Sequence, residues 1–344
     1  MTAPDLLLRL LETPGPSGAE QEAARVWREA ASAFAEVSGD HSGNSFARVG
    51  GTGGRPVVAL LGHLDEIGFI VTHVDDDGRL WFRGVGGWLP EVLLAQRVEI
   101  MARDGTVPGV IYARRDPARR EEKRAVQLKD LFVDIGARSA DEARERVRLG
   151  DVGVIAARPL ELANGRLASR ALDNRLGAYV ALEAARRIAE GGGAAGDVVA
   201  VATVQEEVGD FLGARTAAYA LEPEYAIAVD IMGASDVPGG DPHEAGSLKL
   251  GGGPALLRGP GADPAVFELL RETAEAEGIE YGVEVSAGKS NTDADAVYLS
   301  RAGVRTGVVS IPIRYFHTPC ETVELDDVEA AIRLVAAAAR RLAG

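Results

Sequence analysis

Apolar and polar positions along the chain follow two patterns, strand-like runs and helical spacing. Val57–Leu61 and Val198–Val204 are almost continuously apolar, which is typical of strands buried on both faces. Similar short runs predict strands at Tyr225–Val229 and Val304–Ser310. Helical spacing predicts helices at Leu6–Leu11, Ala19–Ala35, Asp173–Glu190, Pro264–Glu277 and Val328–Leu342. This alternation predicts an α/β fold with a mostly parallel sheet flanked by helices.

The pattern changes between Ile67 and Pro159, where short strand-like pieces follow one another. Turn signals such as Asp76-Asp77-Gly78 separate them, and only Asp141–Arg148 has helical character. The pieces are Ile67–Thr72, Leu80–Arg83, Arg97–Met101, Val107–Tyr112, Leu131–Ile135 and Gly153–Ala157. We therefore expect a small β-barrel-like domain at residues 67–159, inserted into an α/β domain formed by residues 1–66 and 160–344.

Composition narrows the choice of partners. The 344 residues include 37 Lys and Arg against 52 Asp and Glu, a net charge of −15. Such a surface repels nucleic-acid phosphates and anionic membranes, so we expect neither as a partner. No run reaches the ~18 apolar residues of a membrane span. Because Arg9 interrupts Leu6–Leu11, that run resembles an amphipathic helix rather than a signal segment. We expect a soluble, cytoplasmic protein.

Acidic and histidine side chains recur where the predicted strands end or a helix begins. Gly62–Glu66, with His63 and Asp65, follows one strand, and Glu206-Glu207 follows another. The remaining positions are Asp173 at a helix start, Asp230 at the end of Tyr225–Val229, and His317 shortly after Val304–Ser310. Since sites in open α/β sheets lie beyond the carboxyl ends of the strands, these segments are expected to converge.

The residue types point to metal chemistry. Two histidines and several carboxylates, without cysteine, form a nitrogen and oxygen donor set that suits zinc, cobalt or manganese. Carboxylates gathered in one cleft repel one another unless cations neutralise them. Two divalent ions fit the number of donors, and such pairs catalyse hydrolysis. The adjacent acids Glu206 and Glu207 offer one metal ligand and one proton-transferring base.

Taken singly, each of these residues also has an ordinary structural interpretation. Asp173 suits a helix N-terminus, and Glu206-Glu207 suits a solvated surface. His63, His317 and Asp230 suit turns or loops, and Asp65 and Glu66 suit solvated turns. Only their shared position, where predicted strands end or a helix begins, favours a common functional site.

Other candidate groups have no such setting. We expect His41, His73 and His243 to be surface residues and Cys320 to be a packing residue near the site rather than a nucleophile. A lone cysteine excludes an internal disulfide framework and a cysteine-cluster metal site. The chain has no Gly-x-Ser-x-Gly elbow of a serine hydrolase.

In this order, the segments resemble the M42 aminopeptidases, dinuclear metal enzymes related to glutamyl aminopeptidase and the TET peptidases. The resemblance covers nearly the whole chain. It rests on Leu11–Gly18 (LETPGPSG), Gly62–Val71 (GHLDEIGFIV), Lys129–Ala137 (KDLFVDIGA), Arg170–Gly177 (RALDNRLG), Val204–Gly209 (VQEEVG) and Ile311–Glu321 (IPIRYFHTPCE).

The resemblance implies a zinc-peptidase-like catalytic domain with two divalent ions per subunit, Zn²⁺ or Co²⁺ first and Mn²⁺ as an alternative. It makes His63 and Asp230 the terminal ligands of one ion and Glu207 and His317 those of the other. By the same resemblance, Asp173 would bridge both ions. Glu206 would be the general base for a metal-bridging hydroxide, and Asp65 would orient His63. The family's inserted β domain mediates assembly, so a homo-oligomer built from dimers, as large as a dodecamer, is expected.

The sequence departs from the family pattern in three places. One additional residue lies in the loop Asp210-Phe211-Leu212, and Ser290-Asn291 replaces a glycine pair. Tyr112–Gln127 lacks a Pro-Pro-His stretch.

The leading hypothesis is an aminopeptidase that removes N-terminal residues from short peptides. The alternatives are a two-metal amidohydrolase acting on N-acyl amino acids and a catalytically silent binding protein on the same fold.

Overall fold

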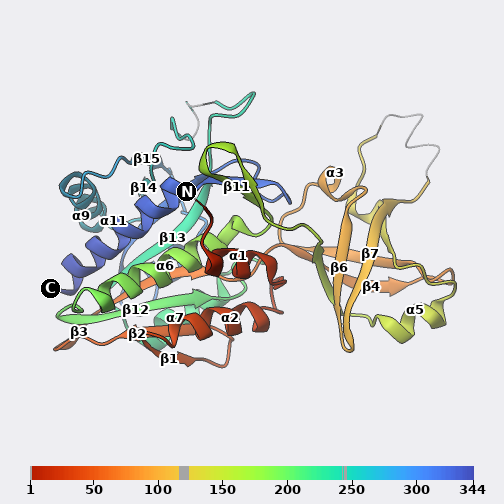
Figure 1. Cartoon of the computed structure of the whole chain (residues 1–344), viewed down its shortest axis with the longest axis horizontal. Coiled ribbons are helices and arrows are strands. Elements are labelled where there is room, and N and C mark those ends of the chain that lie inside the picture. Colours follow the sequence, from red (N-terminus) through yellow and green to blue (C-terminus); the bar gives the residue numbers. More distant parts are fainter. Residues whose placement is uncertain (1, 116–123, 242, 244–245) are drawn as a thin grey trace.

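Among the residues that the computed structural model describes (2–115, 124–241, 243 and 246–344), eight strands form one sheet (Figure 1). In spatial order they are β1 (Glu36–Gly39), β2 (Ser45–Val49), β12 (Gly196–Thr203), β3 (Gly54–His63), β13 (Tyr225–Gly233), β16 (Arg305–Ile313), β14 (Ala255–Arg258) and β15 (Gly282–Val285). The central strands β12, β3, β13 and β16 are parallel, whereas β2 and β14 pair antiparallel with β12 and β16. The expected mostly parallel α/β sheet is confirmed.

Helices cover both faces of this sheet. Val58 and Leu60 of β3 share a core with the helices of one face, and Val57, Ala59 and Leu61 share a core with those of the other. The first face carries α1 (Asp5–Glu12), α2 (Gln21–Ala31), α6 (Leu172–Glu190), α9 (Pro264–Ala276) and α11 (Leu325–Ala343), and the second carries α7 (Leu212–Leu221) and α10 (Ala294–Tyr298). Because alternate strand residues enter opposite layers, the central strands are apolar throughout.

A second, closed sheet forms a barrel that projects from one end of the α/β layer (Figure 1). In the described part of the chain it consists of β4 (Gly68–Val74), β5 (Leu80–Val85), β8 (Leu131–Asp134), β7 (Gly105–Ala113), β6 (Arg97–Ala102) and β9 (Val152–Ile155), in that order around the barrel. Phe69, Leu80 and Ile100 belong to its own apolar core. The short helices α3 (Pro90–Leu93) and α5 (Ala140–Arg146) accompany it. The predicted barrel-like fold is therefore confirmed.

A small three-stranded sheet lies where the chain returns from the barrel. It pairs β10 (Leu160–Leu162) with β11 (Arg166–Ser169), and β11 with β17 (Glu321–Glu324), all antiparallel. Two 3₁₀ turns, Leu128–Asp130 and Ala163–Gly165, complete the described secondary structure. Of the segment Tyr112–Gln127, residues 116–123 lie outside the described residues.

Several element ends differ from the expectation. The helix expected at Ala19–Ala35 ends at Ala31, and the exposed strand β1 follows it. β13 and β16 extend to Gly233 and Ile313, so Asp230 lies within a strand rather than at its end.

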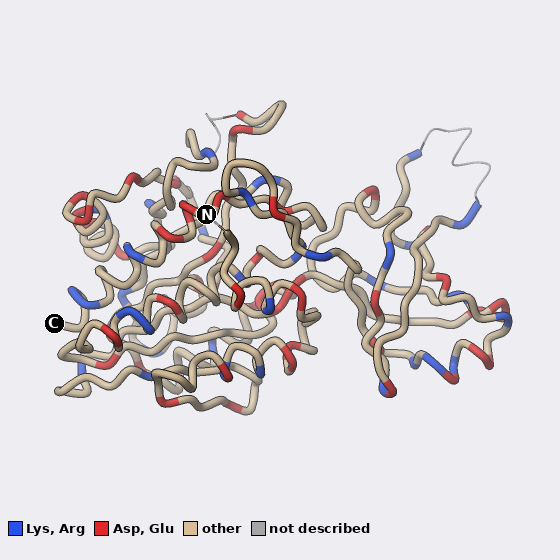
Figure 2. Tube along the Cα trace, in the orientation of Figure 1, with Lys and Arg blue, Asp and Glu red and all other residues tan. Residues whose placement is uncertain are grey.

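No described helix combines the length and apolar character that a membrane crossing requires. Acidic and basic positions are interspersed over both parts of the molecule (Figure 2).

Two glycines set the distance between α6 and the sheet. A Cβ atom on Gly62 of β3 would lie 2.2 Å from the carbonyl carbon of Gly177, and one on Gly177 would lie 2.2 Å from the carbonyl oxygen of Val229. Only glycine permits such a close approach of helix and strand backbones. The first turn of α6 is thereby pressed against the ends of β3 and β13.

We predict that Gly62→Ala lowers the free energy of unfolding by about 1–3 kcal/mol, because the added methyl group forces α6 away from β3. Gly50→Ala is the matched control, since a Cβ there meets no atom within 4 Å. Denaturant unfolding of both variants measures the difference. Equal stability of the two variants would contradict this account of the packing.

Candidate metal centre

The predicted ligands lie together at one edge of the sheet, on five separate segments. His63 is the last residue of β3, and Asp230 lies near the end of the neighbouring β13. Glu207 follows β12, and His317 follows β16. Asp173 lies in the first turn of α6 with a non-helical backbone (φ −78°, ψ 105°), and its side chain contacts His63 at the end of β3. Ligand atoms of His63, Asp173 and Glu207 lie within 4.8 Å of one another, and so do those of His63, Glu206 and Asp230.

The carboxylate of Asp173 lies between the two histidines. Its Oδ1 is 3.3 Å from Nε2 of His63, and its Oδ2 is 3.3 Å from Nε2 of His317. Each oxygen therefore faces a different imidazole. This is the arrangement expected of a carboxylate that can bind one cation through each oxygen.

Glu207 completes a second group of donors. Its Oε2 is 3.4 Å from Nε2 of His317, while its Oε1 is buried and has no hydrogen-bond partner among the described residues. A buried carboxylate oxygen without a partner is costly in a folded protein unless it binds a cation or water. The donor set of imidazole and carboxylate groups thus fits divalent transition metals.

The electrostatics of the cluster show an excess of buried negative charge. Burial raises the pKa of Glu206 to about 10, with His63 opposing the rise and nearby carboxylates adding to it. Burial and the charge of Asp173 raise the pKa of Glu207 to about 7. Burial acts to raise the pKa of Asp173 as well, but its contacts with His317 and His63 lower it to about 2. Cations in the cluster would relieve this repulsion.

Asp65 holds one side of the cluster in place. Its Oδ1 and Oδ2 accept hydrogen bonds of 3.1 Å from the backbone N–H groups of Glu206 and Glu207, and Oδ2 also accepts one of 2.7 Å from the Ser17 hydroxyl. Nδ1 of His63 lies 3.1 Å from the Asp65 carbonyl oxygen and 3.4 Å from Oδ1. With Nδ1 so engaged, Nε2 is directed into the cluster.

Comparisons with known proteins show the family of this chain. The family model of the M42 glutamyl aminopeptidases matches residues 43–334. The chain belongs to the M42 aminopeptidase family. A lysyl aminopeptidase of Pyrococcus furiosus is 36% identical, and the match covers 97% of this chain and 95% of the relative.

Solved structures show the same fold. A TET aminopeptidase from a marine-sediment Thaumarchaeota archaeon matches with a TM-score of 0.93 and 36% identity, covering 98% of this chain and 96% of that one. A TET peptidase of Pyrococcus horikoshii, which can assemble into a tetrahedron or a large octahedral shell, matches with a TM-score of 0.85 and 31% identity, covering 97% of this chain and 98% of that one. As an M42 aminopeptidase, this chain is a hydrolase of a metal-dependent family.

An ionic network around Glu66 was not predicted from the sequence. Glu66 is buried and ion-paired with two buried arginines, Arg170 and Arg175, so its interpretation as a solvated turn residue is wrong. Arg175 also donates to the carbonyl oxygens of Leu64 and Leu10. These contacts tie the end of α1 to the loop that follows His63. An arginine within a helix that is otherwise buried, as in α6, is the sequence signal for such a network.

Six further residues bear on the expectations from the sequence. Cys320 is exposed, so the prediction that it is a packing residue is wrong. Two buried acids, Asp293 and Glu321, border the cluster and were not predicted to act there. The three histidines outside the cluster are exposed, which confirms the prediction for His41, His73 and His243.

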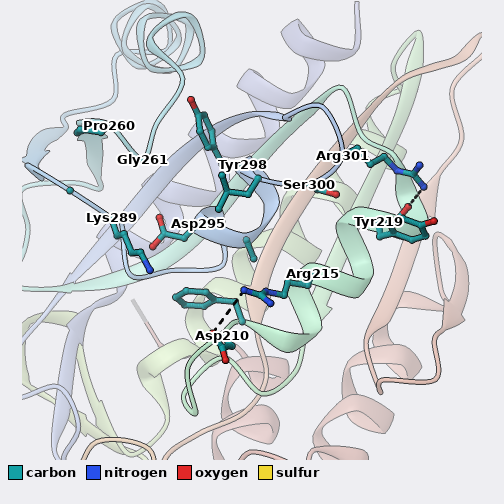
Figure 3. Close-up of a pocket in the computed structure, with 14 residues that line it drawn as sticks. Asp210, Arg215, Tyr219, Pro260, Gly261, Lys289, Asp295, Tyr298, Ser300 and Arg301 are labelled. Carbon is teal, nitrogen blue, oxygen red and sulfur yellow. Dashed lines mark hydrogen bonds and ion pairs between the residues drawn. The ribbon is translucent and has the colours of Figure 1, made fainter.

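A separate pocket of about 610 Å³ opens between α7 and α10 (Figure 3). Phe211, Tyr298 and Leu299 contribute apolar surface, and Arg215 and Lys289 contribute charge. None of the predicted site residues lines it, although Asp210 and Phe211 belong to the loop that follows Glu207. Asp210 and Phe211 therefore form part of the wall of this neighbouring pocket.

We predict that Arg175→Met lowers the free energy of unfolding by about 3–5 kcal/mol, because it removes a buried cation from Glu66 and leaves carbonyl oxygens unpaired. Arg25→Met, which removes an exposed arginine paired with Glu22, serves as control and should leave stability unchanged. Chemical denaturation of the metal-free proteins measures both. A small effect of Arg175→Met would contradict the importance of this network.

Proposed function

We propose that this M42 enzyme is a dinuclear metallo-aminopeptidase that removes N-terminal residues from short peptides. One divalent ion would be held by His63, Asp173 and Asp230, and the other by Asp173, Glu207 and His317. The observation that carries the proposal is the Asp173 carboxylate, whose two oxygens face different histidines at 3.3 Å. Zn²⁺ or Co²⁺ fits this donor set best, and Mn²⁺ is the alternative.

Glu206 is the proposed general base. Its Oε2 lies 3.7 Å from Nε2 of His63, at the edge of the cluster, and burial raises the pKa of its carboxyl group. The cations, when bound, would supply Lewis-acid polarisation of the scissile carbonyl and a lowered pKa of water. Oε2 of Glu206 would take a proton from the attacking water and pass it to the leaving amine. Asp65 keeps Glu206 in place through its backbone N–H.

Recognition of a free N-terminus fits the same charges. A peptide α-ammonium group is a cation, and the cluster is bordered by the buried carboxylates of Asp230, Asp293 and Glu206. An N-acylated peptide lacks that charge. The proposal therefore favours an aminopeptidase over a hydrolase of N-acyl amino acids.

We further propose that residues 67–159 form an oligomerisation domain and that residues 1–66 and 160–344 form the catalytic domain. Val110 and Tyr112 of β7 expose 48% and 59% of their surface on the outside of the barrel, which suits contacts with a second copy. The Pyrococcus horikoshii relative assembles into large shells. By analogy, we propose a homo-oligomer built from dimers, as large as a dodecamer.

The direct test of activity uses free and N-acetylated peptides, with and without a chelator. We expect stepwise loss of N-terminal residues from the free peptides only, and loss of this activity after metal removal. Mass spectrometry identifies the products. Release of acetate would favour the amidohydrolase, and no cleavage at full metal occupancy would favour a silent binding protein.

We predict that Glu206→Gln lowers kcat by about 10²–10⁴-fold while two metal ions stay bound, because only the proton-transferring group is lost. Steady-state kinetics and elemental analysis of the same sample measure the two quantities. Wild-type kcat in this variant would refute the role of Glu206 as the base.

We predict that Glu207→Ala removes one of the two ions, because it deletes a ligand beside His317. Glu268→Ala, at an exposed carboxylate of α9, is the control and should keep both ions. Elemental analysis after dialysis measures the stoichiometry. Two retained ions and full activity in Glu207→Ala would disprove the ligand assignment.

A further inference from the structure

The two histidines of the cluster are oriented in different ways. The ring of His63 is fixed through Nδ1, which lies against Asp65. No described residue makes a hydrogen bond to Nδ1 of His317. Gly87 of the barrel domain lies against that atom instead, since a Cβ on Gly87 would be 3.2 Å from it. His317 therefore needs another source of orientation.

The backbone of His317 supplies a second reason to look for such a source. His317 has a left-handed backbone (φ 57°), as does Tyr315 (φ 62°) two residues earlier. Residues with side chains rarely hold this conformation unless their surroundings stabilise it. The loop that carries His317 is closed at its base by Arg314 and Thr322, whose backbones exchange hydrogen bonds of 2.9 and 3.0 Å.

Glu321 reaches into this loop from the first position of β17. Its Oε1 accepts a hydrogen bond of 2.9 Å from the backbone N–H of His317. Its Oε2 accepts one of 3.1 Å from the backbone N–H of Asp173. The Glu321 side chain is buried, with 2% of its surface exposed. The Glu321 carboxylate thus joins the segment of Asp173, the proposed bridging ligand, to the segment of His317, a proposed terminal ligand.

Burial of another negative charge beside the cluster is costly, which argues that Glu321 serves a purpose there. The residue neighbours Asp173 and Glu207, whose charges repel it. Among the described residues, its partners are backbone N–H groups rather than an arginine or lysine. An uncharged amide of similar size could fill this position without the repulsion, but its single oxygen could not replace both carboxylate oxygens, each of which accepts from a different N–H group.

We propose that Glu321 is a positioning residue that sets the geometry of Asp173 and His317 and so determines the affinity of the second metal site. It does for His317, through the backbone, what Asp65 does for His63 through the ring. This inference rests on the proposed dinuclear function. Groups that orient metal ligands change metal affinity about 10–100-fold when they are removed.

The test is a titration of the metal-free protein with Zn²⁺ against a competing chelator, comparing wild type with Glu321→Gln. The glutamine keeps the size of the side chain, but its amide N–H₂ would face one of the two backbone N–H groups. We expect one of the two Zn²⁺ equivalents to bind about 10–100-fold more weakly, with a smaller change in the other. The matched control is Glu324→Gln, which removes a carboxylate of the same strand that pairs with Arg166 and touches no ligand.

A spectroscopic measurement separates positioning from general loss of stability. With Co²⁺ in place of Zn²⁺, the visible absorption reports the ligand geometry of each ion. We expect Glu321→Gln to change the band of the weakened equivalent and Glu324→Gln to leave both bands as in wild type. If Glu321→Gln does not fold, Glu321→Asp decides, because it keeps the charge but is too short to reach both N–H groups, and an intermediate loss of affinity is expected.

The outcomes distinguish this inference from the proposed function. Two ions in wild type with unchanged affinities and Co²⁺ bands in Glu321→Gln would overturn the role of Glu321 alone. Unchanged affinity in a folded Glu321→Asp, where Glu321→Gln does not fold, would overturn it equally. Fewer than two ions in wild type would overturn the dinuclear function and this inference together.

Discussion

Mutual repulsion among buried carboxylates is the constraint on which this site depends. Asp173, Glu206, Glu207 and Asp230 are gathered at one sheet edge with only two histidines among them. Burial, to which the neighbouring carboxylates add, raises the pKa of Glu206, and Oε1 of Glu207 is buried without a hydrogen-bond partner among the described residues. A protein gains nothing in stability from such a cluster. Binding of divalent cations explains it, because cations turn the repulsion into attraction.

The fold holds these groups together by means that lie outside the cluster. Gly62 and Gly177 allow α6 to approach β3, which places Asp173 over the strand ends. The buried Arg175 joins the end of α1 to the loop after His63. Asp65 and Glu321 then accept hydrogen bonds from backbone N–H groups of the segments that carry the predicted ligands. Rigid support of this kind is what a metal site needs if ions are to meet a preformed geometry.

Sequence reasoning reached the parts of this structure that follow from pattern and chemistry. The apolar run Val57–Leu61 predicted a central strand, and the acids and histidines at strand ends predicted the cluster. The edge strands β1 and β15 were missed, because they bury little and lack a strong apolar pattern. The buried strand β14 was missed because its four residues are too few to give a pattern. Glu321 and Arg175 were also missed as supporting residues, since a single charged residue shows its role only once the fold supplies its partners.

The bridging of two ions by Asp173 can be tested by anomalous diffraction from crystals grown with Zn²⁺. We expect two peaks ~3.5–4 Å apart, one beside His63 and Asp230 and the other beside Glu207 and His317, each in contact with a different oxygen of Asp173. A single peak at full Zn²⁺ saturation, or two peaks of which only one contacts Asp173, would contradict it.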